Sequence, residues 1–458
     1  MNHWCFSQFL TADGWQSDCY VDCDSTGQIN KISNTPTAGV ANYQRIEGYS
    51  LPTFCNVHSH AFQYAIAGLG EFFSADSEKD DFWSWRQSMY KLALAVSPEA
   101  VETIATALYL NMLKAGYSHV AEFHYLHKAP DGNAYENTSQ ISLSLCNAAK
   151  KVGMNLTLVP VFYRSSSFGT PSLATQRRFV FKDTKEYFKL IDELRILIEP
   201  MNHVNLGLGV HSLRAASIEE VVEISEYRRS DEVFHIHVSE QLKEVEDCQT
   251  YYGKRPVELL LDSCSSMKGF FLVHATHLNE TEVSCLASSE ATVVLCPTTE
   301  ANLGDGVFPL NDFCKTGGDF CIGSDSHISI DPFEEIKWLD YGQRLYSGRR
   351  QSVVGVDDSA AYLMKQCWRN GQKALGLNGS SIFPEVGSPL NVLTVSDSYP
   401  LLSQRNPQTW LATMLYAIGK PQMESVMING QRVIKESTHS CEASVNSEFS
   451  ALMTDLKL

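Results

Sequence analysis

A short apolar run followed by a stretch of helical periodicity recurs eight times along the middle of the sequence. Strands that are apolar throughout are expected where both faces of a sheet are buried, as in a parallel sheet. Eight such strands alternating with helices predict a (β/α)8 barrel over residues 51–384. An open doubly wound sheet is the alternative, but no glycine-rich phosphate loop follows any of the runs. The runs are Leu51–Val57, Ser118–Phe123, Leu156–Tyr163, Leu206–Val210, Val233–Val238, Phe270–Ala275, Ala291–Cys296 and Phe320–Ser324.

The stretches between the runs carry helix start signals. Ser97-Pro98 supplies a cap residue and a first-turn proline before an apolar stripe. Three further positions combine a cap residue with an acid three residues later, which is the spacing of a capping box. They are Ser217 with Glu220, Asn279 with Glu282, and Asp331 with Glu334.

The two ends of the chain have a different pattern. Residues 1–50 and residues 385–458 contain short β-like segments with Gly and Pro turns, among them the turn Asn429-Gly430. Two β regions that flank a barrel can pair with each other. We therefore predict a small β-sandwich domain built from both ends, beside the barrel.

Composition argues against nucleic-acid or anionic-membrane binding and against a disulfide-stabilised fold. Lys and Arg number 36 against 53 Asp and Glu, a formal net charge of −17. This balance disfavours nucleic acid and anionic membranes as partners, although a few local cations could still bind a small anionic substrate. The 13 Cys are odd in number and form no Cys-x-x-Cys pair, which favours a reducing compartment over a disulfide framework.

The first residues lack the basic and apolar regions of a signal peptide, and no apolar run is long enough to span a bilayer. We therefore expect a soluble, cytoplasmic protein. Barrel enzymes often dimerise through helix faces, so a homodimer is an arrangement to test.

The longest interval between predicted strands follows the first run and contains Phe82-Trp83-Ser84-Trp85-Arg86. A long insertion at this position predicts a lid or a wall of the substrate pocket. The alternative is a surface helix anchored by its aromatic residues.

Histidine and acidic residues gather where the predicted strands end, and a barrel holds its active site at that end. A single such His is more often structural than functional, but most of the 14 His in the chain lie at these ends. The set therefore predicts a metal site. Its members are His58-Ser59-His60, His124, His211, His237 with Glu240, His274 with His277, and Asp325 with His327.

Strand geometry selects the metal ligands from this set. His58 and His60 are two residues apart and point to the same side of a strand, so both can bind one ion. His237 lies nearer the end of its strand than His235, which we expect one layer lower in the barrel. Barrel closure brings the last strand, with Asp325, beside the first. Three imidazoles and one carboxylate suit Zn²⁺, and Fe²⁺ accepts them too.

The remaining groups at the strand ends suggest a hydrolytic reaction. The metal would supply hydroxide, since zinc lowers the pKa of bound water to about 7. Glu240 would carry protons, a role that Asp325 can share, unless Glu240 is only a helix N-terminal acid. His274 would polarise the substrate or stabilise the intermediate. The strand that ends in His211 contains no Lys to bridge two ions, so we expect one metal.

These motifs resemble the amidohydrolase superfamily. His58-x-His60, His237, His274 and the Asp325 of Gly-Ser-Asp-Ser-His match its deaminase branch, over about residues 50–345. The resemblance implies a barrel hydrolase with metal ligands His58, His60, His237 and Asp325 and with Glu240 and His274 as catalytic partners.

A closer likeness is to the amidohydrolases that convert N-formimino-L-glutamate to N-formyl-L-glutamate and ammonia in histidine degradation. It rests on longer phrases, such as Asn56–Gln63, Val210–Arg214, His237–Gln241 and Pro297–Gly306. This resemblance implies substrate recognition by Gln63, Arg86, Tyr125, His211 and Arg214. Two Arg forks and a Tyr hydroxyl suit the two carboxylates of that substrate.

Three alternative hypotheses of function remain open at this point. A deaminase of the same superfamily could act on a purine or another amidine, which would not need two Arg. A related hydrolase could release formamide instead of ammonia. A barrel without activity could serve as a scaffold, although the four ligands and the acid are all present.

Overall fold

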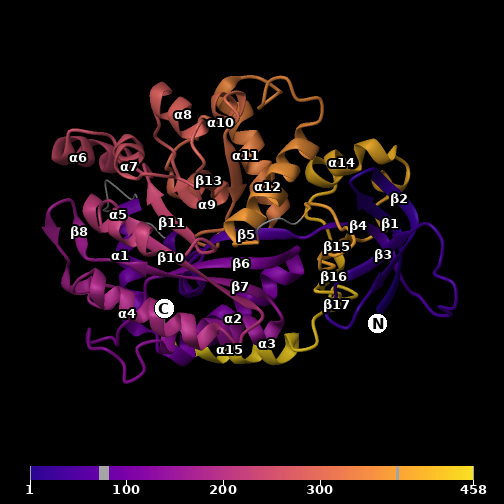
Figure 1. Cartoon of the computed structure of the whole chain (residues 1–458), viewed down its shortest axis with the longest axis horizontal. Coiled ribbons are helices and arrows are strands. Elements are labelled where there is room, and N and C mark those ends of the chain that lie inside the picture. The colour runs from indigo at the N-terminus through magenta and orange to yellow at the C-terminus, as the bar shows by residue number, and fades with distance from the viewer. Residues whose placement is uncertain (1, 72–81, 378–380, 457–458) are drawn as a thin grey trace.

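The computed structural model describes residues 2–71, 82–377 and 381–456. Its larger sheet has eight parallel strands in the order β14-β13-β12-β11-β10-β7-β6-β5. The prediction of a (β/α)8 barrel is confirmed, since each predicted run overlaps one of these strands (Figure 1). The strands are β5 (Phe54–Ser59), β6 (Tyr117–His124), β7 (Asn155–Phe162), β10 (Val204–Ser212), β11 (Val233–Val238), β12 (Phe270–His274), β13 (Thr292–Leu295) and β14 (Asp319–Ile322).

The barrel closes where the end of β14 meets β5. Ser59 and Asp325 form an isolated parallel bridge. The backbone N–H groups of Ser324 and Asp325 donate to the carbonyl of His58 at 3.1 and 3.0 Å. The N–H of His60 donates in turn to the carbonyl of Asp325 at 3.4 Å. Closure therefore holds the first and last strands together at the residues that were predicted to bind a metal.

Helices surround the barrel, and their starts follow the predicted caps. Ser97 Oγ accepts from the N–H of Ala100, and Asp331 accepts from two N–H groups of its helix. Ser217 and Asn279 form complete capping boxes. The helices are α1 (Phe82–Ala95), α2 (Pro98–Ala115), α3 (Gln140–Val152), α4 (Thr184–Ile198), α5 (Ile218–Tyr227), α6 (Leu242–Tyr252), α7 (Pro256–Ser263), α8 (Glu280–Ala287), α9 (Pro297–Leu303), α10 (Leu310–Lys315), α11 (Pro332–Ser347) and α12 (Ser359–Ala374).

Short elements fill the loops between these helices and strands. They are the 3-10 helices η1 (Ala61–Ile66), η2 (Leu69–Glu71) and η3 (Ala174–Gln176) and the short strands β8 (Ser165–Ser167) and β9 (Thr170–Pro171).

The long interval after the first strand is helical where the structure describes it. The segment from Phe82 to Arg86 begins α1 and is therefore helical. Residues 72–81, which complete the predicted lid, lie outside the described residues.

Both ends of the chain contribute to a second sheet, as predicted. Its seven strands lie in the order β17-β16-β15-β4-β1-β2-β3, and the central pair β15 and β4 joins the two ends in antiparallel register. The sheet has its own core around Trp4, Phe6 and Phe9. The strands are β1 (Asn2–Thr11), β2 (Gly14–Cys23), β3 (Ile29–Ser33), β4 (Gln44–Pro52), β15 (Val392–Val395), β16 (Met423–Ile428) and β17 (Gln431–Lys435).

Two details of this region follow from backbone pairing. The predicted run Leu51–Val57 divides at Thr53, because Leu51 pairs with β15 whereas Phe54 pairs with β6. Asn429 and Gly430 turn β16 into β17 with φ angles of 49° and 67°. Positive φ at both positions is typical of a type I′ hairpin turn, which explains the Asn-Gly pair.

Helices that the sequence pattern did not indicate complete the C-terminal part. They are α13 (Pro400–Ser403), η4 (Pro407–Thr409), α14 (Trp410–Tyr416) and α15 (Glu442–Leu456). Helix α15 runs along α2 and α3 (Figure 1). Glu442 pairs with Lys114 of α2, Glu448 Oε2 lies 2.7 Å from Lys151 Nζ of α3, and Phe449 stacks on Tyr64. The last helix thus belongs by packing to the barrel wall.

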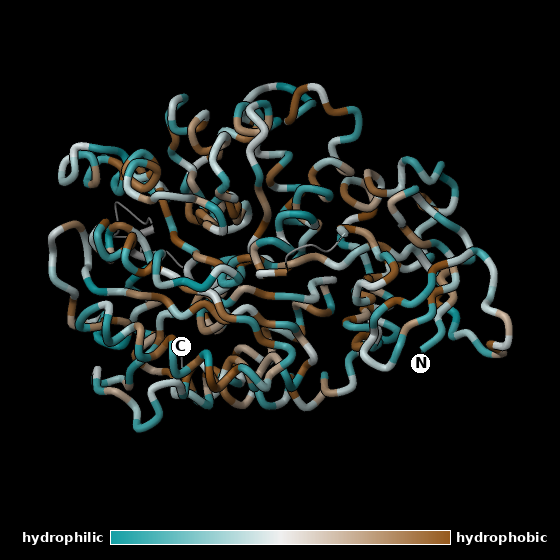
Figure 2. The backbone as a smooth tube through the Cα atoms, in the orientation of Figure 1, coloured by the Kyte–Doolittle hydropathy of each residue, from teal (hydrophilic) through white to brown (hydrophobic). Residues whose placement is uncertain are grey.

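Hydropathy follows this architecture. In Figure 2 hydrophobic residues run along the central strands, and hydrophilic residues are frequent on the outer helices and loops. Within the described parts of the chain, we find no helix with the length and apolar character required to traverse a lipid bilayer.

Candidate active site

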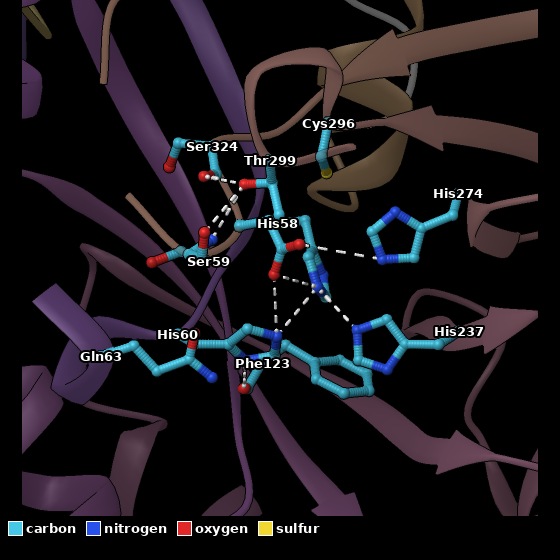
Figure 3. A network of polar contacts seen from close by, with 12 residues as sticks. His58, Ser59, His60, Gln63, Phe123, His237, His274, Cys296, Thr299 and Ser324 are labelled. Atoms are coloured by element: carbon cyan, nitrogen blue, oxygen red, sulfur yellow. Dashed lines mark hydrogen bonds and ion pairs between the residues drawn. The ribbon is translucent and has the colours of Figure 1, made fainter. Parts of the chain in front are cut away.

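Four side chains converge at the C-terminal ends of the barrel strands, as the sequence predicted. His58 Nε2 lies 3.1 Å from His60 Nε2 and 2.9 Å from His237 Nε2 (Figure 3). Asp325 Oδ1 lies 3.5 Å from His58 Nε2 and 3.2 Å from His60 Nε2. One ligand atom from each of the four falls within 4.8 Å of the others, and all four residues are buried.

Backbone carbonyls that contact Nδ1 orient the imidazole rings of His60 and His237. Nδ1 of His60 lies 2.8 Å from the carbonyl of Phe123, and Nδ1 of His237 lies 2.8 Å from the carbonyl of His211. A carbonyl only accepts, so each Nδ1 carries the proton and each Nε2 presents its lone pair to the common centre. This is the arrangement in which metal-ligating histidines are usually held.

The charge state of the cluster also suits a cation. Burial, reinforced by the neighbouring imidazoles, lowers the pKa of His58 and His237 well below the usual value, so both rings are neutral. Burial opposes ionisation of Asp325, but the close approach of His60, at 3.2 Å, and the charge of protonated His274 lower the pKa of its carboxyl. Imidazole nitrogens from three histidines and one carboxylate oxygen fit Zn²⁺ or Fe²⁺.

The strand ends that carry the site are held in a strained backbone conformation. His274, Asp325 and His327 have φ angles of 70°, 46° and 64°, in the left-handed region that L residues seldom adopt. Each such residue costs of order 1–3 kcal/mol, and these residues cluster at functional sites. At Asp325 the backbone bonds to His58 and His60 hold the conformation in place.

Glu240 lies beside this centre, just after β11, and is held on one side by Arg214. Its Oε2 accepts a hydrogen bond from Arg214 Nη2 at 2.6 Å, and its Oε1 lies 3.8 Å from His274 Nε2. Glu244 approaches the same arginine, with Oε2 3.8 Å from Arg214 Nε. Glu244 also accepts from the N–H groups of Ser239 and Glu240. One oxygen of Glu240 is therefore fixed, and the other faces the centre.

His274 stands between several carboxylates. Its Nδ1 lies 3.3 Å from Glu300 Oε1, and its Nε2 lies 3.8 Å from Asp325 Oδ2. Burial opposes protonation, but the hydrogen bond to Glu300 and the charges of Glu240 and Asp325 raise the pKa of His274 to about 10. A protonated His274 can donate a hydrogen bond from Nε2 toward the centre.

The residues that the resemblance assigned to substrate recognition surround His211. Tyr125 and Tyr163 lie edge-on to its ring at 5.7 and 4.9 Å between centroids. Burial, Arg214 and Arg86 together lower the pKa of His211, so both arginines lie within electrostatic range of it.

Gln63 and Arg86 each donate to one of these tyrosines. Gln63 Nε2 donates to Tyr125 Oη at 2.7 Å, and Arg86 Nη2 donates to Tyr163 Oη at 2.9 Å. The five proposed recognition residues are thus linked to the candidate metal ligands through His211, whose ring also contacts that of His237.

Other histidines at the strand ends lie outside the ligand set. His124 bonds to Ser142, and His127 bonds to the carbonyl of Val161. His327 accepts from the N–H of His60 at 3.2 Å and supports the ligand strand. His235 packs one layer lower, as expected, with Nε2 3.4 Å from the carbonyl of Ala374.

The sequence analysis missed several supporting carboxylates. Glu122 accepts from Ser59 Oγ and from the N–H of Ala61, both at 2.6 Å, and so holds the two residues that flank His60. Burial raises its pKa to about 7. Glu300, Glu244 and Asp305 were also missed. An acid inside an apolar run, such as Glu122 in Val-Ala-Glu-Phe, is the signal that could have found the first of them.

Comparison with known proteins finds a matching family and related deaminases. The model of the amidohydrolase family matches residues 49–433. A formimidoylglutamate deiminase from Pseudomonas aeruginosa is 38% identical over 450 residues, which cover 98% of this chain and 98% of that protein. A 5-methylthioadenosine/S-adenosylhomocysteine deaminase from Pyrococcus abyssi is 21% identical over 92% of this chain and 90% of its own length.

Solved structures agree with these sequence matches. An amidohydrolase from Brucella melitensis superposes with a TM-score of 0.92 and 35% identity over the whole of both chains. An adenosine deaminase from Xanthomonas campestris, solved with bound zinc, has a TM-score of 0.81 at 19% identity over 99% of this chain and 98% of its own. At that identity the second structure shows a shared fold alone.

Proposed function

The chain belongs to the amidohydrolase family, and on that premise we propose that it hydrolyses N-formimino-L-glutamate to N-formyl-L-glutamate and ammonia with one bound zinc ion. It is a homologue of a formimidoylglutamate deiminase over nearly its whole length, and it is a hydrolase of C–N bonds. The observation that carries the proposal is the buried convergence of His58, His60, His237 and Asp325, with Glu240, held by Arg214, beside it.

The metal would be held by the three Nε2 atoms and the carboxylate of that cluster. When bound, a divalent zinc ion supplies Lewis acidity that brings the pKa of water down to about 7. Zinc is favoured over iron because three imidazoles and one carboxylate make a set that zinc accepts in tetrahedral geometry. Metal analysis of the purified protein decides between the two ions.

Glu240 is the group best placed to move protons. Its free oxygen, Oε1, faces the centre, while Arg214 keeps Oε2 in place. In this position Glu240 can take a proton from the attacking water and deliver it to the terminal nitrogen, which leaves as ammonia. His274 donates from Nε2 to the oxygen that adds to the formimino carbon.

The rim of the site suits a substrate with two carboxylates. Guanidinium forks bind carboxylates through charge-assisted pairs of hydrogen bonds. Arg86 and Arg214 both lie near His211, and Tyr125 adds a hydroxyl on the same side. A neutral purine would leave the guanidinium groups of buried Arg214 and partly buried Arg86 without an anionic partner from the substrate, which disfavours such a substrate.

The direct test is ammonia release from N-formimino-L-glutamate by zinc-loaded protein, after chelation, and after zinc is restored. We expect release that stops with the chelator and returns with zinc, with N-formylglutamate as co-product. Formamide and glutamate as products would show that the protein releases formamide instead of ammonia, and would overturn the assigned deamination. No release from zinc-loaded protein would overturn the assigned substrate and direct the assay to adenosine derivatives and other amidines.

A further inference from the structure

Cys296 lies in the site without a part in the proposed reaction. It follows β13, precedes α9, and is fully buried. Figure 3 shows its sulfur on the side of the network where His274 enters. His274, Cys296 and Asp325 each offer a ligand atom, and these three atoms all lie within 4.8 Å of one another. They form a second cluster that shares Asp325 with the first.

The two oxygens of Asp325 face different clusters. Oδ1 lies 3.2 Å from His60 Nε2, on the side of the three-histidine cluster. Oδ2 lies 3.8 Å from His274 Nε2, on the side of Cys296. A carboxylate that uses one oxygen for each neighbour is the usual bridge in two-metal sites, where the ions are about 3.5–4 Å apart.

The ring of His274 has the orientation that is usual for a metal-binding histidine. Glu300 holds its Nδ1 at 3.3 Å, which directs Nε2 into the space between Cys296 and Asp325. This buried Nε2 has no hydrogen-bond partner within residues 2–71, 82–377 and 381–456. A carboxylate behind the ring and a nitrogen without a hydrogen-bond partner in front are the features of the carboxylate–histidine–metal arrangement.

Local charge favours a second cation as well. Glu240, Glu300 and Asp325 are three carboxylates around one imidazole. Glu240 Oε1 lies 3.8 Å from His274 Nε2, at the edge of this cluster. A thiolate among the ligands selects soft ions, such as Cd²⁺ or Zn²⁺ in excess, over Mg²⁺ or Ca²⁺.

We propose that His274, Cys296 and Asp325 form a second, inhibitory site for a soft divalent cation beside the first metal centre. The ion forms bonds to the sulfur of Cys296 and to Nε2 of His274, and it displaces the thiol proton and the Nε2 proton to solvent. His274 can then no longer donate to the substrate, and the cation opposes protonation of Glu240, whose Oε1 lies 3.8 Å from His274 Nε2. Turnover therefore falls while the first ion stays in place.

The experiment titrates Cd²⁺ into protein that already holds one equivalent of zinc. Bound metal is counted after gel filtration, the ultraviolet charge-transfer band of a cadmium–thiolate bond is recorded, and ammonia release is assayed. Cys296→Ala and Cys296→Ser remove the sulfur, the second keeping a side chain of similar size. Cys321→Ala is the matched control, since Cys321 is equally buried in the same apolar cluster.

The unmodified protein should take up a second equivalent, gain the band, and lose activity by about a hundredfold, the scale of losing a positioned acid–base group. Cys321→Ala should behave in the same way, whereas both Cys296 variants should lack the second ion, its band and the inhibition. A second ion and equal inhibition in the Cys296 variants, or no Cys296-dependent band in the unmodified protein, would overturn the proposal. Metal counting and spectra need no substrate, so they stand even if the assigned substrate is wrong.

Discussion

Arg214 Nη2 donates to Glu240 Oε2 at 2.6 Å, and both side chains are buried at the ends of neighbouring strands. The pair joins a residue assigned to substrate binding with one assigned to proton transfer. Burial opposes the charge on Arg214, but Glu244 and Glu240 raise the pKa of its guanidinium, which stays protonated. Arg214 therefore serves two purposes, as a candidate anchor for a substrate carboxylate and as the support of the proton carrier.

Replacing Arg214 should for this reason affect both kinetic constants. We expect Arg214→Gln to raise KM and to lower kcat by about a hundredfold, since Glu240 loses the donor that orients it. Arg86→Gln is the comparison, because Arg86 donates to Tyr163 instead of to the acid. It should raise KM with kcat little changed. Steady-state kinetics of both variants, with melting curves to check folding, measure this. A purely KM effect at Arg214 would contradict the dual role.

Glu240 itself should be indispensable for turnover and dispensable for metal binding. Glu240→Gln keeps the shape of the side chain but removes its proton affinity, so kcat should fall by about 10²–10⁴-fold. Glu246→Gln on the exposed face of α6 is a matched control and should leave kcat unchanged. Zinc content is measured alongside and should remain near one equivalent in both. Turnover close to that of the unmodified protein in Glu240→Gln would assign the proton transfers to another group.

Two histidines of β11 allow a proposed metal ligand to be compared with a core residue. His237 and His235 share a face of β11, but only His237 Nε2 reaches His58. His237→Ala should lose bound zinc and activity. His235→Ala should keep zinc and lose about 2–4 kcal/mol of stability, the usual cost of truncating a large core side chain. Metal analysis and urea unfolding distinguish the two. Retained zinc in His237→Ala would remove it from the ligand set.

Much of this site could be predicted because a barrel gathers its strand ends. His58 and His60 follow from the two-residue period of a strand, and Asp325 follows from closure between the last strand and the first. The orientation of individual groups could not be predicted in this way. The contact between Arg214 and Glu240 spans 26 residues and two loops, and no spacing rule specifies it.

The fold was predictable to a similar extent. Apolar runs indicate where the barrel strands lie, but they do not indicate that Leu51 and Phe54 belong to different sheets, since both are equally buried. Helix α15 was missed because its stabilising contacts lie far away in sequence. The pair between Lys114 and Glu442, for example, joins residues 328 positions apart. Local pattern does not contain such information.

Gly323 should be required for barrel closure. A Cβ at this position would lie 2.6 Å from His58 Cβ and 2.8 Å from His58 N, distances that real contacts do not reach. Gly323→Ala should therefore push β14 from β5, separate Asp325 from the histidines, and lower both zinc affinity and stability.

Gly342→Ala is the control, because nothing lies within 4 Å of its added Cβ. Gly342 lies in the interior of α11, where alanine should raise the stability of the protein by up to about 1 kcal/mol. Zinc titration and thermal unfolding of the two variants measure these effects. Unchanged zinc affinity in Gly323→Ala would show that the strands tolerate the extra methyl.

Buried histidines at the other end of the barrel should make the fold sensitive to acid. Burial lowers the pKa of His119 from 6.5 to about 4, so below pH 6.5 the unfolded chain binds a proton that the folded chain does not. Stability from this group is complete above pH 6.5 and is lost as the pH falls toward 4. At pH 4.5 the loss is about 2 kcal/mol.

His119→Gln removes this titration while keeping a polar side chain of similar size beside Ser118. Relative to the unmodified protein, the variant should therefore gain about 2 kcal/mol on going from pH 7 to pH 4.5. Urea unfolding at the two pH values measures the difference, and an activity assay at pH 7 checks that the site is intact. Since the comparison is between two pH values in each protein, any constant cost of the substitution cancels. An equal loss of stability in both proteins would mean that His119 accepts its proton in the folded barrel.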